Sequence, residues 1–192
     1  MSVLLDRLAR YFGSLAPAPG LPRAEGRCAA VACVLDDEPA GPRVLLMKRA
    51  ERAGDPWSGH ISLPGGGYHP GEDADLLATA MRETREELGI DLTGARLLGN
   101  LSPLHPRTSG PAGIEVTPFV FHTRTALEPV CGPEALAAFW LPLDLAASGH
   151  LDTTHEYPLA NMKFPAWTYE GHVIWGLTWR ILGDLLAVGI GK

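Results

Sequence analysis

Three glutamates, Glu83, Glu86 and Glu87, carry the clearest chemical signal in this chain of 192 residues. On a helix, residues at positions i, i+3 and i+4 share one face, so the three carboxylates would lie side by side. Like charges at this spacing repel, and the repulsion destabilises a helix unless a cation lies among them. Carboxylate oxygens are the ligands that hard divalent ions such as Mg²⁺ and Mn²⁺ prefer. The spacing therefore predicts a metal site made by these three residues.

The surrounding residues predict the helix that must position the glutamates. Residues that suit a core recur on another sector of this helix, at Leu77, Ala80, Met81, Thr84 and Leu88. Asp73 or Asp75 can cap its beginning, and Gly89 can end it. Arg82 lies four residues before Glu86, where a charge-assisted hydrogen bond could orient that carboxylate. The alternative is a solvated helix face with ion pairs between positions i and i+4.

A glycine-rich loop, residues 63–72, precedes this helix, and its composition lets a backbone approach a ligand closely. Together the loop and the helix resemble the Nudix box, G-x5-E-x7-R-E-U-x-E-E-x-G-U, the signature of hydrolases that cleave nucleoside diphosphates linked to another moiety. Gly66 and Glu72 match G-x5-E, and residues 82–90 match the second half, with Thr84 at an aliphatic position. Nine residues rather than seven separate Glu72 from Arg82, so the role of the first glutamate is not carried over to Glu72.

The flanking segments resemble the coenzyme A diphosphatase branch of this family. Residues 45–50 and 59–66 are similar to the segment upstream of the box in those enzymes, and residues 174–178 are similar to their WGxT element. Between Arg49 and Gly59 the chain is one residue longer, and residues 54–57 stand in the place of the LRxH portion. The resemblance implies coenzyme A or a close relative as the substrate. We expect the substrate contacts to come from Arg49, Arg52, Gly65, Gly66 and Arg107.

The chemistry that the resemblance implies is the attack of water on a diphosphate. Metal ions held by carboxylates neutralise the charge of the diphosphate and lower the pKa of water. The base that takes the proton from water is either Glu83 or an acid from a distant loop. Glu134, six residues before Trp140, is the first distant candidate, and Glu115 is the second. We therefore expect the catalytic residues Arg82, Glu83, Glu86, Glu87 and Glu134, with Mg²⁺ or Mn²⁺ as the cofactor.

Three functions remain open at this point. The first is a metal-dependent diphosphatase that acts on coenzyme A or an acyl-CoA. The second is a Nudix hydrolase of another nucleoside diphosphate derivative or of a nucleoside triphosphate. The third is a Nudix-like binding module without catalysis, which would be expected to lack one or more of the box glutamates, whereas this chain keeps all three.

The composition limits the partners and the location. A net charge of −6 argues against a general nucleic-acid binder, which would need basic surfaces. No apolar run approaches the ~18 residues of a membrane span. Charged residues interrupt the N-terminal apolar residues, so a signal peptide is not expected and the cytoplasm is the expected location. We expect a small-molecule nucleotide as the partner, with no nucleic acid and no membrane.

Several cysteines, histidines and aromatic residues have simpler interpretations than a ligand site. Three cysteines, Cys28, Cys33 and Cys131, lack the spacing of a zinc site and are expected to be buried free thiols. The same lack of metal-binding spacing applies to His60, His69, His105 and His155. A group of large aromatic residues near the C-terminus is expected to complete the core or a homodimer contact, namely Trp167, Tyr169, Trp175 and Trp179.

The pattern of elements predicts one α+β domain over residues 1–192, an α/β/α sandwich in which helices flank a mixed sheet. A helix and a linker are expected over residues 1–20, and the core over residues 25–190. Strands are expected at residues 28–35, 44–48, 60–63, 95–104, 116–122 and 139–143, with an acidic turn at 36–42 and a hairpin over 164–174. Helices are expected at residues 3–15, in the Nudix box, shortly after 143, and at 176–188.

Overall fold

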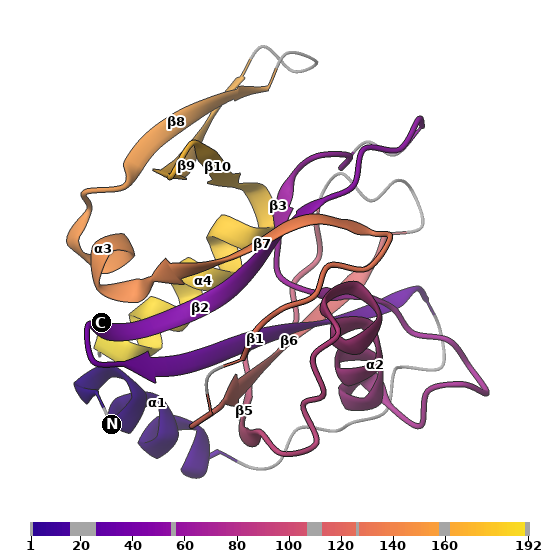
Figure 1. The fold of residues 1–192 in the computed structure, drawn as a ribbon, viewed down its shortest axis with the longest axis horizontal. Helices are drawn as coiled ribbons and strands as arrows, with labels where there is room; N and C mark the ends of the chain where they lie inside the picture. The colour runs from indigo at the N-terminus through magenta and orange to yellow at the C-terminus, as the bar shows by residue number, and fades with distance from the viewer. Residues whose placement is uncertain are drawn as a thin grey trace.

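A mixed β-sheet lies between layers of helices in the computed structural model (Figure 1), which describes residues 2–15, 26–54, 57–106, 113–125, 127–157 and 162–190. Its strands are β1 (Cys28–Glu38), β2 (Gly41–Arg49), β3 (Ile61–Ser62), β4 (Gly65–Gly67), β5 (Arg96–Asn100), β6 (Glu115–His122) and β7 (Ala135–Pro142). The main path runs β3-β2-β1-β6-β5, while β4 pairs with β1 and β7 pairs with β2. The β1–β6 pair is parallel and the other pairs are antiparallel, which makes the sheet mixed.

Helices cover both faces of this sheet because each face carries its own apolar cluster. On one face, α2 (Leu76–Leu88) packs Ala80 and Leu88 against buried residues of β1, β2 and β6. On the other face, α1 (Val3–Gly13) and α4 (Gly176–Ile190) bury their apolar stripes against the sheet and against each other. Each fully buried leucine contributes about 1.5–3 kcal/mol of hydrophobic stabilisation. The expected α+β fold, with helices flanking a mixed sheet, is confirmed.

A second, antiparallel sheet lies above the first in Figure 1 and contains β8 (Asp152–Tyr157), β9 (Met162–Tyr169) and β10 (His172–Trp175) in the order β10-β9-β8. The short helix α3 (Leu143–Ser148) connects it to β7. Trp167 is buried and lies 6.2 Å from Trp179 between ring centroids, so these two rings belong to the core, as does the partly buried Tyr169. Trp175 is half-buried and packs with neighbouring rings, including those of His60 and His155.

The structure corrects several predicted boundaries. The acidic segment 36–42 is mostly strand rather than turn, because Arg43 donates across the hairpin to Asp36 and Glu38 and so stabilises the pairing. The glycines of β4 form a strand through their pairing with β1, although the sequence predicted a loop there. β5 ends at Asn100 rather than near residue 104, β7 begins at Ala135 rather than 139, and β8 was not expected.

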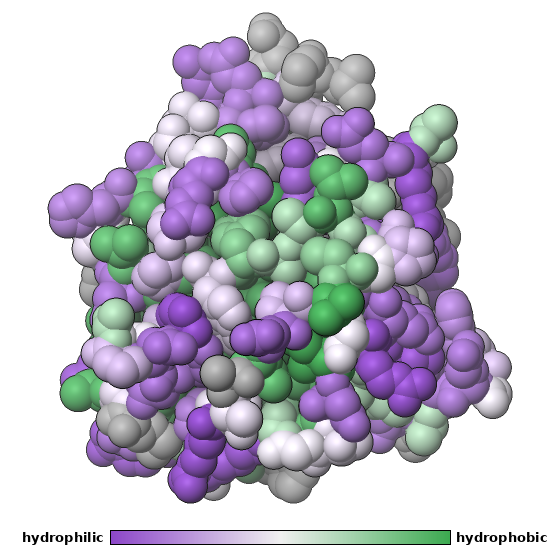
Figure 2. Space-filling view, viewed as in Figure 1, coloured by the Kyte–Doolittle hydropathy of each residue, from purple (hydrophilic) through white to green (hydrophobic). Residues whose placement is uncertain are grey.

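The face drawn in Figure 2 carries apolar residues around its middle, which β7 crosses in the same view of Figure 1, with hydrophilic residues around them. Leu136 on β7 and Val130 in the segment before it are exposed apolar side chains. The segment that leads into β7 therefore lies at the surface.

Within the described residues, no helix has the length and apolar character that a bilayer crossing requires. The three cysteines are free, but only Cys33 is buried, whereas Cys131 is exposed.

Candidate active site

The helix α2 begins and ends where its capping residues require. The Asp75 carboxylate accepts a hydrogen bond from the Ala78 N–H at 2.8 Å, so Asp75, and not Asp73, is the N-cap. Gly89 ends the helix in the left-handed conformation, with φ of 65°, which glycine adopts without strain. Thr84 occupies an aliphatic position of the Nudix box because its buried hydroxyl donates to the Ala80 carbonyl oxygen at 2.7 Å. These contacts fix the register that brings the glutamates to one side of α2.

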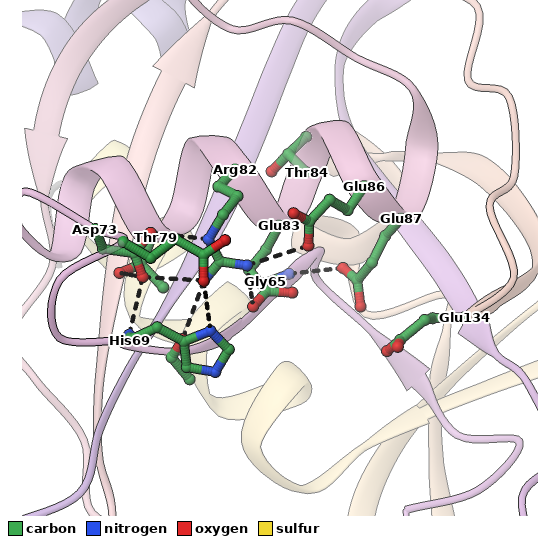
Figure 3. Close-up of polar contacts among 12 residues, drawn as sticks. Gly65, His69, Asp73, Thr79, Arg82, Glu83, Thr84, Glu86, Glu87 and Glu134 are labelled. Atoms are coloured by element: carbon green, nitrogen blue, oxygen red, sulfur yellow. Dashed lines mark hydrogen bonds and ion pairs between the residues drawn. The ribbon is translucent and has the colours of Figure 1, made fainter.

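Arg82 connects the acids of the site (Figure 3). Its Nη1 donates to Glu83 at 2.9 Å and to Glu86 at 3.1 Å, which confirms the expected contact with Glu86. Its Nε and Nη2 donate to the two oxygens of Asp73 at 2.8 and 2.9 Å. This bidentate pair raises the pKa of Arg82, and it holds the pKa of Asp73 at about 2. Arg82 therefore orients two of the three glutamates from a fixed position.

The acid that fixes Arg82 is Asp73 rather than the adjacent Glu72. The Asp73 side chain is buried and also accepts from the Thr79 hydroxyl and the His69 N–H. Glu72 is exposed and pairs with the His69 ring at 3.1 Å. From the sequence alone, Asp73 is expected only as a possible cap of the helix. The spacing could have indicated Asp73. The Nudix box has seven residues between its first acid and its arginine, and this chain has eight between Asp73 and Arg82 but nine between Glu72 and Arg82.

Glu87 is the most buried of the three glutamates, with 2% of its surface exposed. Burial raises the pKa of its carboxyl group to about 8, and the negative charges of Glu83 and Glu134 act in the same direction. The Gly65 N–H, which donates to Glu87 at 2.9 Å, and the charge of Arg49 act in the opposite direction. Burial also raises the pKa of Glu83. Positive charge near this site would therefore be strongly stabilising.

The two glycines of the loop have steric roles that the Nudix box does not reveal. Gly65 has a φ of +149°, and a Cβ atom there would overlap the backbone of β1 at Ala30 and Val31. A Cβ atom on Gly66 would overlap the Glu83 carboxyl group. Glycine is therefore needed at position 65, so that the loop can lie against β1 and donate to Glu87, whereas a side chain at position 66 would displace the Glu83 carboxyl group.

The donor set of this site fits a hard divalent cation. Three carboxylates project from the same stretch of α2, two of them have raised pKa values, and the lack of a side chain on Gly66 makes room for the Glu83 carboxyl group itself. In the described residues, no three acidic, imidazole or thiol groups converge on one point. Arg82 engages Glu83 and Glu86 while Glu87 faces Gly65, so coordination of one cation by all three carboxylates would require side-chain rotation, in which the half-exposed Glu86 would leave Arg82.

The two distant candidates for the general base, Glu134 and Glu115, differ in their position relative to the three glutamates of α2. Glu134 lies beside Glu87 in Figure 3, its charge acts on Glu83 and Glu87, and its own carboxylate pairs with Arg52 at 3.2 Å. Glu115, in contrast, lies 3.5 Å from His105. The structure therefore brings Glu134 and Arg49 near enough to Glu87 for their charges to act on it, and it brings Arg52 into contact with Glu134. Arg107, the fifth expected substrate contact, lies outside the described residues.

Comparisons with known proteins agree with this geometry. The family model of the NUDIX domain matches residues 26–162. An uncharacterized Nudix hydrolase, NudL of Photorhabdus laumondii, is 33% identical over 190 residues, which cover 96% of this chain and 97% of that protein. NudL of Yersinia pestis, also uncharacterized, is 32% identical over 148 residues, or 75% of this chain and 71% of that protein.

Solved structures show the same fold. An Ap4A hydrolase of C. elegans in a binary complex matches with a TM-score of 0.58 and 18% identity, over 86% of this chain and 99% of that one. A Nudix hydrolase of Alicyclobacillus acidocaldarius matches with a TM-score of 0.53 and 21% identity, over 67% of this chain and 84% of that one. With its acidic helix, its glycine loop and these relatives, the chain belongs to the Nudix hydrolase family.

Proposed function

We propose that this protein hydrolyses the diphosphate linkage of coenzyme A or an acyl-CoA, with Mg²⁺ or Mn²⁺ as its cofactor. Nudix hydrolases act on small nucleotide substrates and generally use divalent metals. The observation that carries the proposal is the group of three carboxylates on α2, in which Arg82 contacts Glu83 and Glu86 and the Gly65 N–H of the glycine loop donates to Glu87. The similarity of residues 45–50, 59–66 and 174–178 to coenzyme A diphosphatases supports the choice of substrate.

The residues of this chain have separable roles in the proposed reaction. Glu83, Glu86 and Glu87 would hold the cation, and Arg82 keeps the first two in orientation. A bound divalent cation supplies charge neutralisation at the diphosphate and lowers the pKa of the attacking water. We propose the backbone of Gly66 and the side chain of Arg49 as substrate contacts, together with Arg107.

Hydrolysis requires one proton acceptor. The oxygen of water forms a bond to one phosphorus, and the bond from that phosphorus to the bridging oxygen breaks. The bridging oxygen leaves with the bonding electrons on the other phosphate group, and one proton of the water passes to a carboxylate. We propose Glu134 as this general base, because it is the distant acid whose charge acts on the buried glutamates.

The test is turnover of a panel of diphosphate substrates with Mg²⁺ or Mn²⁺, with products identified by mass. Coenzyme A should yield 4′-phosphopantetheine and 3′,5′-ADP. Rapid turnover of another nucleoside diphosphate derivative without turnover of coenzyme A would refute the substrate and leave the reaction type standing. A folded protein that hydrolyses no compound of the panel would refute both.

A further inference from the structure

The segment that carries Glu134 is attached to the end of α2. The Val130 N–H donates to the Leu88 carbonyl oxygen and the Gly132 N–H to the Glu87 carbonyl oxygen, both at 2.8 Å. Gly132 approaches so closely that a Cβ atom there would overlap the Glu86 carbonyl oxygen. The backbone of this segment is therefore fixed relative to the helix that presents the glutamates.

Glu134 also contacts the loop that follows β2. The Ala50 N–H donates to the Glu134 carbonyl oxygen at 2.8 Å, and Arg52 Nη2 donates to the Glu134 carboxylate at 3.2 Å. Arg52 is itself placed by its backbone N–H, which donates to the Ser58 hydroxyl at 2.7 Å. Thus the backbone fixes where Glu134 lies, and the guanidinium group is the contact that orients its carboxylate.

The ion pair between Arg52 and Glu134 matters more for the position of the Glu134 carboxylate than for the stability of the fold. Both side chains are about half exposed, at 51% and 45%, and such pairs contribute little to the free energy of folding. The Glu134 carboxylate, however, lies within the field of Glu83 and Glu87, and like charges repel it from the place where a base is needed. The Arg52 guanidinium group, which contacts this carboxylate at 3.2 Å, offsets the unfavourable energy of the like charges and holds the carboxylate at one position. Because Glu134 partly neutralises its charge, the Arg52 guanidinium group would also attract a phosphate less strongly.

We propose that Arg52 is a positioning residue that holds Glu134 in place as the general base, and that it acts through Glu134 rather than by contacting the phosphates. This inference rests on the proposed function, in which Glu134 accepts the proton of water. It predicts that the effect of removing Arg52 depends on the presence of the Glu134 carboxylate. A phosphate contact would have an effect that does not depend on it.

A double-mutant cycle separates these two roles. Arg52→Ala should lower kcat by about 10- to 100-fold and change KM less than about threefold, while Glu134→Gln should lower kcat by about 10²- to 10⁴-fold. In the double variant, the Arg52 substitution should add no further loss. Arg52→Lys should restore part of kcat. Arg180→Ala is the matched control, because it removes another exposed arginine that pairs with an acid, Asp184 on α4, and it should leave kcat unchanged.

Binding without turnover gives a second, independent measurement. The ligand is the diphosphate substrate with a methylene group in place of the bridging oxygen, and calorimetry should give the same affinity for Arg52→Ala and the unsubstituted protein. A tenfold loss of affinity, or kcat/KM losses that multiply in the double variant, would show that Arg52 contacts the substrate and would overturn the inference alone. Full activity of Glu134→Gln would overturn it together with the proposed base. Absence of turnover by the unsubstituted protein would instead refute the proposed function.

Discussion

At the scale of single residues, Arg82 determines how the acids of the site are arranged. Its guanidinium group is anchored by Asp73 and extends its remaining donors to Glu83 and Glu86. The anchoring acid is buried and the engaged Glu86 is about half exposed. Substitutions at these two acids should therefore have different consequences, because one supports the folded structure and the other is the exposed acid that we propose as a ligand of the cation.

Glu86→Gln should lower turnover by several orders of magnitude and leave the fold intact. The amide has nearly the shape of the carboxylate but carries no negative charge for a cation, and the exposed side chain contributes little to packing. We would measure kcat with Mg²⁺ and Mn²⁺ and the midpoint of thermal unfolding. Glu156→Gln, an exposed glutamate on β8, should change neither. Nearly full activity of the Glu86 variant would contradict the assignment of a metal site to α2.

Asp73→Asn should destabilise the protein in a manner that depends on pH. The folded pKa of Asp73 is about 2, against an ordinary value of 3.8, so its charge contributes about 2 kcal/mol to the free energy of unfolding at neutral pH. Because the folded pKa is depressed, this contribution is present above about pH 4 and is lost as the pH falls towards 2. Urea unfolding at pH 7 and pH 3 should show the difference between the two proteins shrinking at the lower pH.

The adjacent glutamate is the control for this prediction. Glu72 matches the glutamate of the Nudix box by its spacing from Gly66, but it is exposed and pairs only with a histidine side chain among its described contacts. Glu72→Gln should change the free energy of unfolding by less than about 0.5 kcal/mol at both pH values. If Glu72→Gln were the more destabilising of the two, the anchoring role that we assign to Asp73 would be wrong.

At the scale of elements, the segment before β7 joins the end of α2 to the loop after β2. Gly132→Ala should lower both stability and kcat, because the added Cβ atom would overlap the Glu86 carbonyl oxygen and displace the residues that lead to Glu134. Overlaps of this kind cost about 1–3 kcal/mol. Thermal unfolding and kcat are the two measurements. Gly94→Ala is the control, since a Cβ atom there meets open space, and an equal effect of both substitutions would exclude the steric explanation.

Elements whose signals are local could be predicted from the sequence, and elements that depend on distant partners could not. The helix α2 is predictable because its apolar spacing, its two candidate caps Asp73 and Asp75, and its stop at Gly89 all lie within one short segment, and the structure selects Asp75 as the cap. The strand β4 consists of three glycines, which have no side-chain pattern, and it exists through its pairing with β1. The partnership of Arg82 with Asp73 was missed for the same reason, because it forms only when the intervening loop folds back onto the helix.

At the scale of the whole molecule, the helices α1 and α4 lie outside residues 26–162, the part that matches the family model. These two helices nevertheless cover one face of the sheet. Leu8 of α1 is fully buried, and Arg7 donates to the Ile190 carbonyl oxygen at 3.1 Å. The apolar cluster that includes Leu8 also includes residues of β1, β2 and β6. This continuity implies that α1 unfolds together with the sheet rather than as a separate unit.

Leu8→Ala should therefore lower the free energy of unfolding by about 2–5 kcal/mol, the usual cost of a cavity at a buried leucine. Tyr11→Ala, on the same helix but 43% exposed, should cost much less. Urea unfolding followed by tryptophan fluorescence and by far-ultraviolet circular dichroism should give one coincident transition for each variant. If Leu8→Ala produced an early loss of helix signal while the tryptophan transition stayed in place, α1 would be an independent appendage. The face of the sheet opposite α2 would then be stabilised by α4 without it.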